Sequence, residues 1–273
     1  MPRADIKKAV KVISRVWMAT GVLAVSYGLI ALNSTPVLPI PVALGGSDQA
    51  AQTDLAPTQR LAAASTLWTQ ESGPGGDPFS AGFAAFELAS VLHDPAWAKT
   101  AVARLTVAQE AMPQMAQIGA WRGAARSLIA RDFPVQGLWQ MVPGPGFVRI
   151  YYVRSAVADL NAAVEADPKD PISRLLRAAS LAGMPGFLAS HETSRADFAL
   201  MAHWADDPGL NPAQADVLTS AKWRADFFRL YAEALEQDGH TDQAQAQRLH
   251  LASARQTSGT KELSKWNAAR LIQ

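Results

Sequence analysis

The spacing of apolar residues predicts a chain of α-helices from Leu55 onward. Apolar side chains recur three and four residues apart, which places them on one face of a helix, and no stretch gives the alternation of a strand. Glycine and proline cluster between these segments and favour turns there. The pattern predicts an all-α protein with helices over residues 57–70, 79–92, 95–110, 115–131, 150–166, 171–182, 193–206, 212–236, 241–255 and 260–271.

A shorter pattern repeats within this helical part of the chain. A small residue is followed after four positions by an apolar residue, after three more by another small or apolar residue, and after five more by a proline. Residues three and four apart share a helical face, and small residues there let a second helix approach closely. The sets are Ala101-Leu105-Ala108-Pro113, Ala156-Leu160-Ala163-Pro168 and Ala196-Leu200-His203-Pro208, in which histidine replaces the small residue. A weaker fourth, Ala244-Arg248-Leu251, lacks the proline.

The helix before each set carries the other half of a hairpin pattern, such as Trp121-x-x-Ala124-Ala125-x-x-Leu128. On these motifs, most clearly in residues 156–171 and 228–247, the chain resembles the tetratricopeptide-repeat family over about residues 80–258. The resemblance implies antiparallel helix hairpins stacked into a right-handed superhelix. Successive units are 55, 40 and 48 residues apart, whereas the family repeats every 34 or so. The alternative is an alanine-rich helical bundle, because 52 of the 273 residues are alanine.

The N-terminal residues predict that the protein is located at a membrane. Residues 1–15 carry five basic side chains and one acidic side chain, and Val16–Leu32 is an uncharged, mostly apolar run long enough to span a bilayer. Basic residues stay on the cytoplasmic side. We therefore expect a basic cytoplasmic head (1–15), a single-pass inner-membrane anchor (16–33), a Pro/Gly-containing linker (34–56) and a periplasmic helical domain (57–273) of a bacterial protein. A cleaved signal peptide is the alternative for residues 16–33.

Composition and charge exclude several classes of site. The chain contains no cysteine, which rules out disulfides, thiolate metal sites and a cysteine nucleophile. A formal net charge of +1 argues against nucleic acid as a partner. The five histidines lie at none of the close spacings of a metal site. We therefore expect no metal and no cofactor.

The candidate site follows from the resemblance, because first helices line a concave groove in tetratricopeptide-repeat proteins. Two arginines four residues apart, and a third at the matching place of a later unit, would bind a partner carboxylate; the alternative is that they only face water. Two phenylalanines would line the far end of the groove, and a loop tryptophan would be an exposed aromatic anchor. These residues are Arg122, Arg126, Arg229, Phe83, Phe86 and Trp139. The remaining body tryptophans at 97, 121, 204 and 223 are predicted to fill the core.

The sequence thus predicts a membrane-anchored periplasmic scaffold that binds a partner protein of an envelope, export or maturation complex. The rival is an enzyme, because Gln70-Glu71-Ser72 and residues 137–143 resemble lytic transglycosylase motifs, with Glu71 as the acid/base. That family keeps the two motifs far closer than the 66 residues that separate them here. Binding of a small ligand in the groove is a third possibility.

Overall fold

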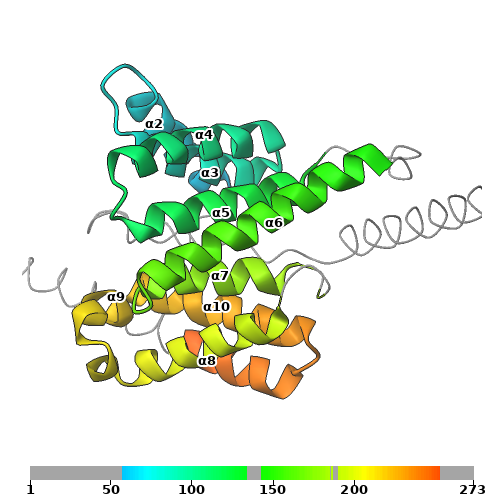
Figure 1. Cartoon of the computed structure of the whole chain (residues 1–273). Helices are drawn as coiled ribbons and strands as arrows, with labels where there is room; N and C mark the ends of the chain where they lie inside the picture. Colours follow the sequence, from blue (N-terminus) through cyan, green and yellow to red (C-terminus); the bar gives the residue numbers. More distant parts are fainter. Residues whose placement is uncertain (1–56, 134–142, 185, 187–189, 253–273) are drawn as a thin grey trace, which may run out of the picture.

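The computed structural model describes residues 57–133, 143–184, 186 and 190–252, and these fold as packed α-helices without strands (Figure 1). The all-α prediction is confirmed. The helices are α2 (Pro57–Glu71), α3 (Pro78–Leu92), α4 (Pro95–Ala111), α5 (Ala116–Arg131), α6 (Pro143–Ala166), α7 (Pro171–Ala182), α8 (His191–Asp206), α9 (Ala215–Thr219) and α10 (Ala221–Gln237), with two 3-10 turns, η3 (Pro208–Leu210) and η4 (Pro212–Gln214). One further helix begins at Thr241 and extends at least to residue 252.

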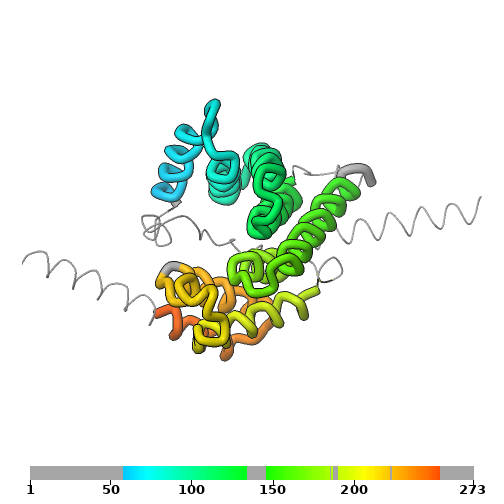
Figure 2. Tube along the Cα trace, turned by 60° about the vertical axis from the view of Figure 1, so that its left-hand side comes forward, coloured from blue at the N-terminus to red at the C-terminus, as the bar shows by residue number. Residues whose placement is uncertain are grey.

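Helices that are neighbours in sequence pack against each other as hairpins. The α3 helix packs on α4, α5 on α6 and α7 on α8, and Ala244 of the last helix lies in a small core with Ala232 and Leu235 of α10. Helices α2–α5 form one side of the molecule and α7–α10 the other, with α6 running from one side to the other (Figure 2). The predicted pairing into hairpins is therefore present in the described residues.

Aspartate–proline pairs begin three of the helices. Asp77, Asp94 and Asp170 each occupy the N-cap before a proline at the first helical position. Each carboxylate accepts hydrogen bonds from backbone N–H groups of the first turn, which would otherwise lack a partner. The proline costs little there, because its position needs no N–H donor. These local signals explain why the predicted starts of α3, α4 and α7 lie within one residue of the observed ones.

In two hairpins, α3–α4 and α5–α6, the small and apolar residues of the repeated pattern lie in the contact between the paired helices. Ala101, Leu105 and Ala108 of α4 are buried, as are their counterparts in α6. Trp121 of α5 is 1% exposed, and its ring meets Phe83 and Phe86 edge-on at centroid distances of 5.1 Å each. Trp204 and Trp223 are also buried, whereas Trp97 is only partly buried.

Two glycines of α5 test how closely α5 and α6 approach. A Cβ at Gly123 would lie 2.8 Å from Leu160 Cγ and 3.0 Å from the Ala156 carbonyl oxygen. A Cβ at Gly119 would lie 3.3 Å from the flexible end of Gln109. Alanine at either position gains about 1 kcal/mol of helix propensity, but overpacking against a fixed backbone costs about 1–3 kcal/mol.

We therefore expect opposite effects of the two substitutions. Gly119→Ala should raise the free energy of unfolding, and Gly123→Ala should lower it by about 1 kcal/mol. Urea unfolding of both variants measures the difference. Equal stabilisation by both would contradict the close approach of α5 and α6.

Three predicted boundaries are wrong, each for a local reason. The α6 helix begins at Pro143, so residues 143–146 open a helix instead of forming a bend. The predicted helix 212–236 is broken at Ser220, whose hydroxyl accepts from Trp223 N–H and caps α10. Serine prefers such caps to helix interiors because it can replace the missing backbone partner. His191, expected in a loop, is the first residue of α8.

The third hairpin also departs from its predicted register. Ala196 and His203 are exposed, and Leu200 is only partly buried. The buried residues at the same spacing are Ser194, Phe198 and Met201, two positions earlier. The α8 helix is therefore rotated about its axis relative to the prediction. This rotation places Asp197 against α7, where it pairs with Arg174 and Arg177.

No helix in residues 57–133, 143–184 and 190–252 is both long and apolar enough to cross a bilayer. The predicted anchor (16–33), the basic head (1–15), the linker (34–56) and the helix predicted over 260–271 all lie outside the described residues. Those expectations stay predictions.

Candidate functional site

The first of two arginine–aspartate clusters joins α5 to α6. Arg122 donates from Nε and Nη2 to the two carboxylate oxygens of Asp159, at 3.0 and 2.9 Å. Arg126, one turn later, donates from Nη1 to Asp159 Oδ2 at 2.6 Å. The aspartate side chain is 10% exposed, and the two arginines are 22% and 24% exposed. The carboxylate that these arginines bind is thus the protein's own.

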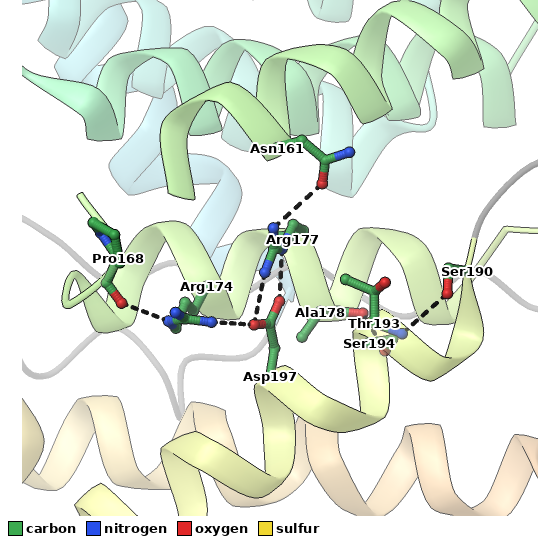
Figure 3. Close-up of polar contacts among 9 residues, drawn as sticks. All are labelled: Asn161, Pro168, Arg174, Arg177, Ala178, Ser190, Thr193, Ser194 and Asp197. Atoms are coloured by element: carbon green, nitrogen blue, oxygen red, sulfur yellow. Dashed lines mark hydrogen bonds and ion pairs between the residues drawn. The ribbon is translucent and has the colours of Figure 1, made fainter. Parts of the chain in front are cut away.

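The second cluster joins α7 to α8 in the same manner (Figure 3). Arg177 donates from Nε and Nη2 to the two oxygens of Asp197, at 2.7 and 2.8 Å, and Arg174 donates from Nη1 to Oδ1. The Asp197 side chain is 2% exposed. Arg174 also donates to the Pro168 carbonyl at 2.7 Å and stacks over the Trp204 ring. This cluster is more buried than the first.

The two clusters share one design. In each, two arginines one turn apart on the first helix of a hairpin hold one aspartate on the second helix. That aspartate directly precedes a large core residue, Leu160 in α6 and Phe198 in α8. Each cluster therefore carries two guanidinium groups for one carboxylate, a surplus of one positive charge. Paired N–H donors give arginine this fixed geometry toward a carboxylate.

The α6 helix connects the clusters. Its Asp159 accepts from α5, while Asn161, two residues later, accepts from Arg177 of α7 at 3.3 Å. At the other end of these helices, Gln117 of α5 donates to the N-cap Asp170 of α7 at 2.9 Å. Polar contacts thus continue from α5 through α6 and α7 to α8.

The repeat pattern does not predict the second cluster, although the sequence contains a signal for it. Hydrophobic periodicity marks a buried face but gives no reason to place an aspartate on it. Asp159 nevertheless lies three residues after the buried Ala156 of α6, and Asp197 lies three residues after the buried Ser194, which takes the corresponding place in α8. Arginines one turn apart in both preceding helices complete the signal.

The other predicted groove residues are not brought to the clusters. Arg229 pairs within its own helix, with Asp226 at 3.5 Å and Glu233 at 3.2 Å. Burial raises the pKa of Glu233, and Arg229 partly opposes that shift. Phe83 and Phe86, expected to line an open groove, are 5% and 0% exposed and belong to the core around Trp121. That expectation is wrong for both, because the two rings pack edge-on against the buried Trp121 instead of facing a groove. Trp139 lies outside the described residues.

Glu71, the acid/base of the rival enzyme hypothesis, makes a hydrogen bond across a turn. Glu71, the last residue of α2, accepts a hydrogen bond from Asp77 N–H at 2.8 Å across the glycine-rich turn. Residues 137–142 of the second transglycosylase-like motif lie outside the described part of the chain. Within the described part, no group of three or more histidine or acidic side chains is arranged to hold a metal ion. His203, which the repeated small-and-apolar pattern places on a packed helix face, is exposed.

Comparison with known proteins gives no family for the chain: no protein-family model, no curated protein and no solved structure matches it significantly.

Proposed function

We propose that this protein is a membrane-anchored scaffold on the periplasmic side of the bacterial inner membrane. Its tetratricopeptide-like helical hairpins would form the superhelix expected from the resemblance and bind a partner protein of an envelope complex. The packing of α3 on α4, α5 on α6 and α7 on α8 supports the repeat architecture. The basic head and the apolar segment 16–33 support the address.

The surplus positive charge of the arginine clusters carries the proposal. A guanidinium group has five N–H donors; the bonds to Asp159 use two donors of Arg122 and one of Arg126. Both side chains keep over a fifth of their surface exposed. An acidic segment of a partner is the ligand that such a surface favours, because charge-assisted bonds to carboxylates are stronger than neutral ones.

Partner capture from membranes tests this function. Crosslinking followed by co-purification of the full chain should recover a specific membrane or envelope protein. In a variant with Arg122→Ala and Arg126→Ala, recovery should fall about tenfold, since a hydrogen bond to a charged group contributes about 1.5–3 kcal/mol. Arg248→Ala is the matched control, because Arg248 is an exposed arginine of the last hairpin.

A second pair of variants separates binding from folding. Arg122→Lys with Arg126→Lys retains the charge toward Asp159 but loses the paired donors, so the chain should fold while capture weakens. Undiminished capture by the alanine variant would refute the arginine assignment. Protease added to spheroplasts tests the address: it should remove the helical body, and full protection would refute the proposed topology.

A further inference from the structure

The N-terminal half of α6 exposes an unusual set of large apolar side chains. Phe147, Val148 and Tyr151 are 60%, 40% and 65% exposed, and they share one side of the helix because they lie one turn apart. On the opposite side Arg149 and Val153 are each 1% exposed. The buried side fixes the helix, so the exposed set, hereafter the α6 aromatic face, is presented rigidly.

The buried side of this half-helix is held by specific contacts. Arg149 Nε donates to the Ala130 carbonyl at the end of α5, at 3.0 Å, and burial lowers the pKa of Arg149 while Asp132 opposes that shift. On the exposed side, the Tyr151 ring meets the ring of the partly buried Tyr152 edge-on at 5.6 Å. The first turns of α6 extend beyond the helices beside them (Figure 1). The α6 aromatic face is therefore an outward surface of a fixed element.

Net charge differs among three parts of the described chain. Residues 116–166, which include α5 and α6, contain five arginines and three acidic residues, a net charge of +2. Residues 57–115 contain three basic and five acidic residues, a net charge of −2, and residues 167–252 contain eight and twelve, a net charge of −4. Arg122 and Arg126 pair with Asp159, Arg131 pairs with Asp132 and Arg149 is buried. Arg154 is the exposed arginine beside the α6 aromatic face and the group that a negatively charged surface would attract.

We propose that the α6 aromatic face lies on the surface of the anionic bilayer that holds the predicted anchor; this inference rests on the membrane-anchored function proposed above. Aromatic side chains favour the interface between lipid and water, and a helix with an apolar side and nearby basic residues binds there in the plane of the membrane. Arg154, one turn after the face, is exposed and would meet lipid headgroups.

The predicted linker (34–56) would keep the helical body close to the bilayer, so a weak contact is enough to orient that body on the membrane surface. Residues 34–56 join the predicted anchor to α2, and 23 residues span at most about 80 Å when fully extended. A tethered surface meets the bilayer at a high effective concentration, so three apolar side chains can orient the body without binding free vesicles tightly.

Depth-dependent fluorescence quenching tests the inference on the full chain. The protein has no cysteine, so Tyr151→Cys and Leu249→Cys each provide a single labelling site, at positions whose native side chains are equally exposed, 65%. Each variant is labelled with an environment-sensitive dye and reconstituted in vesicles of phosphatidylcholine and phosphatidylglycerol that carry a shallow lipid-bound quencher. Quenching should be several-fold stronger at 151 than at 249. Phe147→Glu in the chain labelled at 151 should abolish this difference, whereas Leu249→Glu should not.

The outcomes separate the inference from the function on which it rests. Resistance to alkaline extraction reports insertion of the anchor. An inserted chain with equal quenching at both positions overturns the docking of the α6 aromatic face alone. A chain released by alkaline extraction overturns the anchored function and this inference with it. Energy transfer between labels at 151 on different chains, without lipid quenching, would assign the face to a second copy and also overturn docking to lipid.

Discussion

Replacing Asp197 with alanine is expected to lower the free energy of unfolding by about 3–5 kcal/mol, the usual cost of removing one partner from a buried ion pair. Asp197 is the common acceptor of Arg174 and Arg177, and its side chain is 2% exposed. The two arginine side chains are 15% and 12% exposed, so water would restore little of the lost interaction. The substitution leaves two positive charges together in a poorly hydrated site between α7 and α8.

Chemical denaturation of the full chain in detergent measures this loss. Glu236→Gln is the control, because the Arg248–Glu236 pair is 48% and 37% exposed, and exposed pairs contribute about 0–1 kcal/mol. Replacing all three charged residues with apolar residues of similar size should cost less than Asp197→Ala alone, since no unpaired charge then remains buried. A cost below that of Glu236→Gln would show that the second cluster does not hold the hairpin.

Replacing Trp121 with alanine is expected to have a comparable effect, a loss of about 3–5 kcal/mol. The ring is 1% exposed and sits edge-on to Phe83 and Phe86, with interplanar angles of 90° and 74°. Its removal would leave a cavity between α3 and α5 that the surrounding helices fill only partly, because cores are close-packed. The same change would loosen the α5 turn that carries Arg122, so partner capture should fall with stability.

Trp121→Phe gives the matched control. Within the described residues the indole Nε1 of Trp121 has no hydrogen-bond partner, so phenylalanine loses ring area but no hydrogen bond. Its unfolding midpoint should lie much closer to that of the native chain than to that of Trp121→Ala. Equal losses for both variants would mean that the indole nitrogen, and not the packing of the ring, stabilises this part of the core.

The arginine clusters connect stability to the proposed function. Asp197→Ala tests a cluster whose aspartate is almost fully buried, and Arg122→Ala with Arg126→Ala tests one whose arginines reach the surface. We expect the deeper cluster to affect mainly unfolding and the shallower one mainly partner capture. The difference follows from exposure, since the two clusters have the same composition.

Much of the secondary structure and pairing is determined by local sequence. Apolar residues at helical spacing set the all-α class, and the Asp-Pro pairs at Asp77, Asp94 and Asp170 fix helix starts to within a residue because capping and proline geometry act over one turn. Small residues such as Ala101 and Ala156 mark where hairpins close, because only small side chains permit close helix approach. Such signals need no knowledge of the rest of the fold.

Only the tertiary structure decided which charges and rings are buried, and against what. The register of α8 shifts by two residues because Asp197 meets Arg174 and Arg177, a contact between helices that periodicity within one helix cannot specify. Phe83 and Phe86 turn inward to Trp121, while Phe147 and Tyr151 remain on the surface. All four are aromatic in the sequence, and their burial depends on whether a neighbouring helix covers the face on which they lie.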